Sequence, residues 1–279
     1  MLITSSAQAQ NLFVSDTDGN INEYTPGGVQ STFATGLETP LGLACNSAGD
    51  LFAADDGSDN IYEYTPGGVR STFATGLHTP LGLACNSAGD LFAADLGSDN
   101  IYKFTPGGVQ STFASKLGGP TGLAFNSAGD LFAADSSGNI NEFTPDGVES
   151  TFATGLNNTY ALAFNDAGDL FAVDSSGNIN EFTTDGVEST FATGLGNNTI
   201  ALAFNGASDL FAADYTGGNI YEFTPGGVQS TFASGGNPGG LAFQPVPEPS
   251  ALGLLALGVT ALLVHRRPAS FGFNAIGGE

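Results

Sequence analysis

A phrase of Leu-Phe, two further residues and Asp occurs six times at almost constant spacing, and this repetition restricts the fold more than any other feature. The copies begin at Leu12, Leu51, Leu91, Leu131, Leu170 and Leu210, in steps of 39 or 40 residues. Periods of about 40 residues are typical of proteins in which one supersecondary unit packs against its own copies. The chain is therefore expected to form six similar units packed side by side.

Each period contains four short apolar runs separated by turn residues. In one copy the runs are Gly-Leu-Ala-Phe (122–125), Asp-Leu-Phe-Ala-Ala-Asp (130–135), Asn-Ile-Asn-Glu-Phe (139–143) and Val-Glu-Ser-Thr-Phe-Ala (148–153). Runs of this length suit strands and are too short for helices, and the intervening Asn, Gly, Asp and Pro residues suit tight turns. Four antiparallel strands per period predict one blade of a propeller.

The two ends of the repeat predict a closed ring. The first copy lacks its Gly-Leu-Ala-Phe run, whereas the run at 239–243 has no copy after it. If this last run joins the first copy, every blade has four strands and no sheet edge is left open at the seam. We therefore expect an all-β, six-bladed β-propeller over residues 11–244, closed by the strand at 239–243.

The repeat also resembles a known family. The phrases GLAFNSAGDLFAADSSGNI (122–140) and GLACNSAGDLFAADDGSDNIYEYTPGG (42–68) look like the NHL-type repeat of six-bladed propellers. That family is related in shape to the gluconolactonase and regucalcin enzymes and to the streptogramin lyases. Folds of this kind carry many unrelated activities, so the resemblance implies the fold more specifically than the function.

Charge separates the propeller from the C-terminal segment. The chain has 28 acidic residues against 5 Lys and Arg, and beyond residue 245 only Glu248, Glu279, Arg266 and Arg267 are charged, which leaves an excess of 23 negative charges on residues 1–245. A surface of this sign repels phosphate backbones and attracts cations. Nucleic acid is therefore not an expected partner.

The chain has two cysteines, Cys45 and Cys85, in the same position of successive copies. Two cysteines do not make a disulfide scaffold, and a spacing of 40 residues matches no metal-site pattern. They are interpreted as buried free thiols, with a disulfide between them as the alternative if the two strands are neighbours.

An Asp ends the second strand of every copy. The six residues are Asp16, Asp55, Asp95, Asp135, Asp174 and Asp214. A carboxylate before a Gly-containing turn accepts hydrogen bonds from the backbone N–H groups of that turn, so a structural role is expected. The alternative is a ring of acids that concentrates cations at one end of the channel. Two stretches, 15–22 and 54–61, have closely spaced oxygen ligands as calcium loops do, but neither has the spacing of an EF-hand.

The connections between blades are where the copies differ most. They contribute Glu38, His78, Lys116, Asn157, Asn158, Asn197, Asn198 and Asn237. In the gluconolactonase-like enzymes, acidic and Asn side chains at the channel mouth hold a divalent metal ion. The resemblance thus implies Glu38, Asn157, Asn198 and Asn237 as candidate ligands of Ca²⁺ or Mg²⁺, with His78 and Lys116 as candidate ligand-binding residues. No blade pairs a His with a distinctive nucleophile, so no catalytic residue is assigned.

The C-terminal segment, residues 245–268, resembles the PEP-CTERM sorting signal. Pro247, Glu248 and Pro249 precede an uncharged run at 251–264, and Arg266 and Arg267 follow it. The resemblance implies an exported protein of a Gram-negative bacterium, held at the inner membrane by a hydrophobic helix and processed by an exosortase-type protease. Residues 269–279 are expected to be a tail.

Export also predicts an N-terminal signal. Residues 1–10 contain Ala7-Gln8-Ala9, which resembles the small-residue site where a signal peptide is cleaved. We therefore expect residues 1–10 to be the remnant of a signal peptide whose start lies upstream.

Two functions remain open from the sequence. The first is an exported, non-enzymatic propeller that binds a protein or a polysaccharide in the cell envelope or in a biofilm matrix. The second is a divalent-metal-dependent lactonase-like or lyase-like enzyme with its site at the channel mouth.

Overall fold

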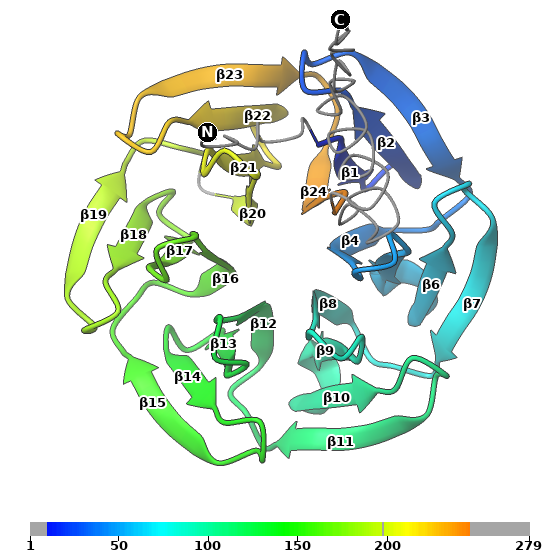
Figure 1. Ribbon diagram of the computed structural model, residues 1–279, viewed down its shortest axis with the longest axis horizontal. Coiled ribbons are helices and arrows are strands. Elements are labelled where there is room, and N and C mark those ends of the chain that lie inside the picture. Colours follow the sequence, from blue (N-terminus) through cyan, green and yellow to red (C-terminus); the bar gives the residue numbers. More distant parts are fainter. Residues whose placement is uncertain (1–9, 197, 246–279) are drawn as a thin grey trace, which may run out of the picture. The chain divides into compact units, whose positions relative to one another are not determined.

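The computed structural model describes residues 10–196 and 198–245. The predictions for the signal-peptide remnant, for Asn197, for the sorting signal from Pro247 to Arg267 with its hydrophobic helix, and for the tail at 269–279 lie outside these residues. Within them, 24 strands form six four-stranded antiparallel sheets arranged as blades around a central axis (Figure 1). The predicted six-bladed propeller is confirmed.

In blades 2 to 6 the strands follow chain order from the axis outward, whereas in blade 1 the last strand, β24, is the innermost. Blade 1 contains β24 (Pro238–Phe243), β1 (Leu12–Asp16), β2 (Asn20–Tyr24) and β3 (Gln30–Thr35); blade 2 contains β4 (Pro40–Cys45), β5 (Leu51–Asp55), β6 (Asn60–Tyr64) and β7 (Arg70–Thr75); blade 3 contains β8 (Pro80–Cys85), β9 (Leu91–Asp95), β10 (Asn100–Phe104) and β11 (Gln110–Ser115). Blade 4 contains β12 (Pro120–Phe125), β13 (Leu131–Asp135), β14 (Ile140–Phe143) and β15 (Glu149–Ala153); blade 5 contains β16 (Thr159–Phe164), β17 (Leu170–Asp174), β18 (Ile179–Phe182) and β19 (Glu188–Ala192); blade 6 contains β20 (Thr199–Phe204), β21 (Leu210–Asp214), β22 (Asn219–Phe223) and β23 (Gln229–Ser234). Short 3₁₀ turns, η1 (Asp56–Ser58) and η2 (Leu96–Ser98), follow β5 and β9.

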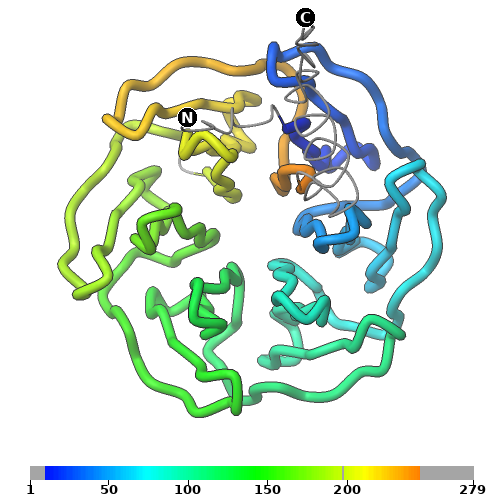
Figure 2. The backbone as a smooth tube through the Cα atoms, in the orientation of Figure 1, coloured from blue at the N-terminus to red at the C-terminus, as the bar shows by residue number. Residues whose placement is uncertain are grey.

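The two ends of the propeller meet in blade 1. The chain travels once around the ring in Figure 2, and β24 pairs antiparallel with β1, with Phe243 opposite Leu12. The backbone N–H of Gln244 donates to the carbonyl of Asn11 at 2.9 Å, which extends this pairing by one bond. The predicted closure by the strand at 239–243 is therefore confirmed, and no inner strand is left without a partner at the seam.

The turns form for the reasons that the sequence suggests. In the turn from β4 to β5, the side-chain oxygen of Asn46 accepts hydrogen bonds from the N–H groups of Ala48 at 3.0 Å and Asp50 at 2.9 Å. In the turn from β2 to β3, the hydroxyl of Thr25 accepts a hydrogen bond from the N–H of Val29 at 3.2 Å. In both kinds of turn, a short polar side chain thus accepts hydrogen bonds from backbone N–H groups of the turn.

Apolar packing between blades, rather than within them, forms the core. In each outer strand one residue forms a β-bulge, because the register shifts there; in β3 this residue is Phe33. The bulge turns Phe33 inward between Phe13, with ring centroids 4.8 Å apart, and Tyr64 of the next blade, at 5.8 Å. The same arrangement joins Phe73 to Phe104 and Phe113 to Phe143. Each blade therefore buries part of its aromatic surface against the neighbouring blade.

Candidate functional site

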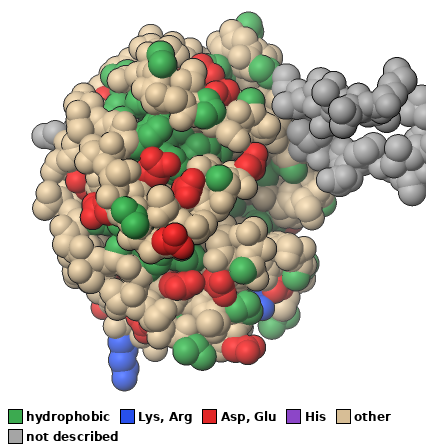
Figure 3. Space-filling view, turned by 60° about the vertical axis from the view of Figure 1, so that its left-hand side comes forward, with side chains coloured by type: hydrophobic (Ala, Val, Ile, Leu, Met, Phe, Trp, Pro, Cys, Tyr) green, Lys and Arg blue, Asp and Glu red, His purple; other side chains and the backbone are tan. Residues whose placement is uncertain are grey.

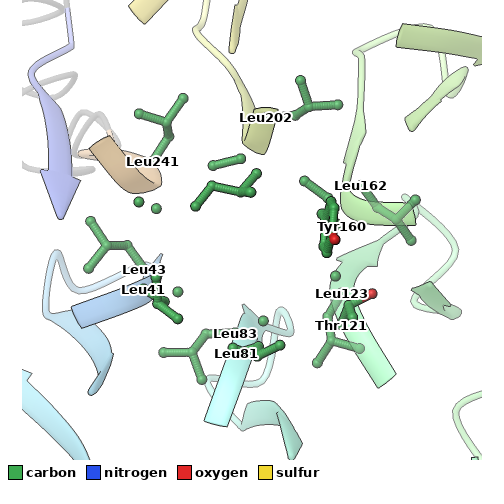
Figure 4. A pocket seen from close by; sticks show the side chains of 18 residues that line it. Leu41, Leu43, Leu81, Leu83, Thr121, Leu123, Tyr160, Leu162, Leu202 and Leu241 are labelled. Carbon is green, nitrogen blue, oxygen red and sulfur yellow. The ribbon is translucent and has the colours of Figure 1, made fainter. Parts of the chain in front are cut away.

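The inner strands enclose a channel along the axis of the ring. Its cavity has a volume of about 230 Å³, and Figure 4 shows side chains from all six blades around it. One layer of the wall is made of leucines only: Leu43, Leu83, Leu123, Leu162, Leu202 and Leu241. The 18 residues of the wall include no Asp, Glu, His, Cys, Lys or Arg. The channel is therefore an apolar cavity.

Glycine in the middle layer lets the inner strands approach closely. A Cβ atom on Gly42 would overlap the carbonyl oxygen of Leu81 in the next blade, and one on Gly82 would overlap the carbonyl of Thr121. Blades 5 and 6 have Ala161 and Ala201 at the equivalent positions of the wall. Four blades thus require glycine at this layer because the backbone of the neighbouring blade occupies the space of a side chain.

The third layer, nearest the connections between blades, differs from blade to blade. It contains Leu41, Leu81, Thr121, Tyr160, Ile200 and Gly239. Two of these side chains are polar, and their positions are fixed: the hydroxyl of Thr121 donates to the carbonyl of Thr159 at 2.6 Å, and the hydroxyl of Tyr160 accepts from the amide of Asn158 at 2.7 Å. Sequence reasoning missed this layer, although one variable position within an otherwise constant phrase was a usable signal.

The repeated Asp residues serve the fold, as predicted. Asp135 accepts hydrogen bonds from the N–H groups of Ser137 and Asn139 in its own turn, each at 2.9 Å. In blades 2 and 3 the backbone donors come instead from the connection that enters the blade: Asp95 accepts from the N–H of His78 at 2.7 Å. Burial is the main cause that raises the pKa of Asp95. Five of the six carboxylates are at most 5% exposed, namely Asp55, Asp95, Asp135, Asp174 and Asp214.

The candidate residues from the connections do not line the cavity. Glu38, His78 and Lys116 have exposed side chains on the connections that enter blades 2, 3 and 4. The backbone N–H groups of Glu38 and His78 are used by the fold, because they donate to Asp55 and Asp95.

The three Asn candidates enter blades 5, 6 and 1. The amide of Asn157 donates to the hydroxyl of Ser176 at 3.3 Å, and the amide of Asn237 donates to Asp18 at 3.5 Å. The carbonyl of Asn198 accepts from the N–H of Tyr215 at 3.0 Å. Within residues 10–196 and 198–245, no three His, Cys, Asp or Glu side chains are close enough together to hold a metal ion.

The two thiols lie on neighbouring inner strands, β4 and β8, and are free. Burial is the main cause that raises the pKa of Cys45 to about 12, and the nearby Cys85 and Asp50 add to it. Burial alone raises the pKa of Cys85 to about 12. The thiols are free, as predicted, but both residues are partly buried rather than buried. Their high pKa values are those of structural rather than reactive cysteines.

The described propeller ends at Pro245, and the sequence Val-Pro-Glu-Pro follows directly. Residues 245–267 match the PEP-CTERM protein-sorting motif. The chain therefore joins a six-bladed propeller to the sorting signal of exported proteins, as the sequence predicted. In the part of the chain that the structure describes, there is no helix with the length and apolar character needed to cross a membrane.

Solved structures share the fold at low sequence identity. A chain of the nidogen/laminin complex is 18% identical, with a TM-score of 0.78 over 86% of this chain and 99% of that one. A gluconolactonase from Xanthomonas campestris is 14% identical, with a TM-score of 0.68 over 84% and 88%. A streptogramin B lyase is 15% identical, with a TM-score of 0.59 over 86% and 75%. No curated protein matches the chain. These likenesses establish the propeller fold alone.

Proposed function

We propose that the chain is an exported propeller that acts without catalysing a reaction, as a binding or structural module of the bacterial cell envelope or extracellular matrix. The sorting motif supports export and processing by an exosortase-type protease. In this proposal, residues 1–10 are what remains of the export signal, and residues 245–268 hold the chain at the inner membrane of a Gram-negative bacterium until processing. Residues 269–279 are proposed to be a tail.

The residues that line the channel support the proposal that the protein is not an enzyme. Enzymes need a nucleophile, a general acid or base, or metal ligands within reach of the substrate. The wall of the channel offers only aliphatic side chains, glycines, one Thr hydroxyl and one Tyr hydroxyl. The ionisable side chains in the connections are instead exposed, or occupied by hydrogen bonds within the fold.

The surface supports a binding role for a protein or a polysaccharide. Figure 3 shows Asp and Glu side chains spread over the visible face of the propeller and few Lys or Arg. The chain as a whole carries a net charge of −23. This negative charge favours a partner with basic groups, or a neutral glycan with bridging cations, and disfavours nucleic acid.

The enzyme alternative makes a different prediction that calorimetry can test. A lactonase-like or lyase-like site built on Glu38, Asn157, Asn198 and Asn237 would bind Ca²⁺ or Mg²⁺ tightly in a one-to-one ratio. Titration of the full chain with each ion is expected to give only weak, salt-sensitive binding. Tight one-to-one binding that Glu38→Ala abolishes and the surface variant Glu149→Ala leaves intact would overturn the proposal.

The sorting part of the proposal is tested separately in a host that contains an exosortase. The wild-type chain is expected to be exported and shortened near Pro247. Replacement of Pro247, Glu248 and Pro249 by Ala is expected to leave the chain uncut, as detected by its mass in the membrane fraction. Identical processing of both chains would show that the motif is not used.

A further inference from the structure

The channel combines an apolar wall with a single polar corner, a combination typical of sites for amphipathic small molecules. The wall presents the six-leucine layer described above, and beyond it the layer with Leu41, Leu81 and Ile200. Tyr160 and Thr121, from adjacent blades 5 and 4, are the two polar side chains of the wall, and Figure 4 shows them next to each other.

The polar corner has unused hydrogen-bonding capacity. The amide of Asn158 donates to the hydroxyl of Tyr160, which leaves the hydroxyl hydrogen of Tyr160 free to donate to a ligand in the channel.

Charge limits the polar end of the ligand to a neutral group. The wall contains no cation to pair with a carboxylate or a phosphate, and the chain carries a net charge of −23. A neutral hydroxyl can accept from the hydroxyl of Tyr160. An anionic head group can accept as well, but it is repelled by the net negative charge of the chain.

The cavity limits the size of the buried part. An apolar cavity of about 150 Å³ holds benzene, so by proportion a cavity of this volume holds roughly nine non-hydrogen atoms. We propose that the channel binds a neutral, straight-chain amphipathic molecule, with its aliphatic chain along the leucine layer and a hydroxyl end at Tyr160. This inference rests on the proposed binding role and names a ligand class for it.

Binding of 1-octanol to the full chain, measured by isothermal titration calorimetry, tests the inference. Wild type is expected to bind 1-octanol at one site and octanoate at least about tenfold more weakly. Tyr160→Phe is expected to weaken octanol binding about fivefold to tenfold, because one hydrogen bond is lost. The matched control is Tyr102→Phe, which removes the same type of bond, from the amide of Asn100 at 3.1 Å, on β10 away from the channel.

A blocking variant shows where the ligand lies. Ile200 belongs to the variable layer and is only partly buried, so Ile200→Trp fills the mouth of the channel without replacing a core residue. It is expected to abolish binding while its unfolding stays cooperative. No binding by wild type, equal binding by Ile200→Trp, or equal effects of Tyr160→Phe and Tyr102→Phe would overturn the inference. None of these results would bear on the non-catalytic role, which the metal titration tests.

Discussion

The backbone N–H of Thr39 donates a 2.6 Å hydrogen bond to the carboxylate of Asp55, and so ties the connection that enters blade 2 to the turn at the end of β5. The same carboxylate accepts from the N–H of Glu38 at 3.0 Å and from the hydroxyl of Ser58 at 2.8 Å. Asp55 is 1% exposed. One buried side chain therefore holds three donors from two segments, the connection before β4 and the turn after β5.

Replacement of Asp55 by Ala is expected to destabilise the propeller by about 2–4 kcal/mol, because buried donors lose their acceptor. Thermal unfolding followed by circular dichroism measures the effect, and a decrease in Tm of about 5–15 °C is expected. The adjacent Asp56 is the control: burial is the main cause that raises its pKa, so Asp56→Asn removes an unfavourable charge and leaves Tm unchanged or higher. Equal losses in both variants would contradict the role given to Asp55.

The substitution Gly42→Ala is expected to destabilise the ring by about 2–3 kcal/mol, because the added methyl group would overlap the carbonyl of Leu81 in the next blade. Gly27→Ala is the matched control, since nothing lies within 4 Å of a Cβ atom at that exposed turn position. Chemical denaturation of Gly42→Ala and Gly27→Ala measures both effects. If the two variants are equally stable, the inner strands do not approach each other as closely as described.

The fold was predictable because every copy repeats the same order of short apolar runs and turn residues. Turn residues such as Asn46 and Thr25 determine where strands end. The first copy lacks its first run, and this made it possible to predict that β24 closes the ring. The channel wall was harder to predict. An inner strand presents its edge and both its faces near the axis, so Leu41, Gly42 and Leu43 all line the cavity and no alternation marks them. The partners of Asp95 also escaped prediction, because the donor His78 belongs to a different segment of the chain.

Acid is expected to stabilise the propeller slightly, through Glu63, Glu181 and Glu222. Burial is the main cause that raises the pKa of each in the folded state, and a nearby Asp adds to it: Asp50, Asp169 and Asp209 respectively. A folded-state pKa above the unfolded value means that the folded chain binds the proton more tightly. Stability therefore rises as pH falls through the raised pKa values toward the unfolded value of about 4.3.

Thermal unfolding at about pH 7.5 and at about pH 4.5 measures this effect, and a higher Tm is expected at the lower pH. Replacing the three glutamates together by Gln is expected to raise Tm at the higher pH and to flatten the dependence. The control replaces Asp146 by Asn and Glu149 and Glu188 by Gln, which removes the same charge from exposed positions. Asp90 acts in the opposite direction, because the hydrogen bond from Lys103 is the main cause that lowers its pKa, and its contribution is lost only below about pH 4.

Residues 10–245 are expected to unfold at the same temperature as the full chain, within about 1 °C. The 24 strands and the bonds that close the ring lie within these residues. Differential scanning calorimetry of both chains tests this expectation. A lower Tm or a broader transition in the shorter chain would mean that the C-terminal segment stabilises the propeller.

The two thiols are expected to react slowly with a disulfide reagent as long as the propeller is folded. A rise in pKa from 9.0 to about 12 lowers the thiolate fraction at pH 8 by about three orders of magnitude, and the higher nucleophilicity of such a thiolate recovers somewhat more than one of them. The folded chain should therefore react about thirtyfold more slowly than the chain in denaturant, or slower still where the reagent cannot enter. The variants Cys45→Ser and Cys85→Ser assign the rates to each thiol. Reaction of either thiol at the unfolded rate would show that blade 2 or blade 3 opens at its inner strand, where β4 and β8 carry these residues.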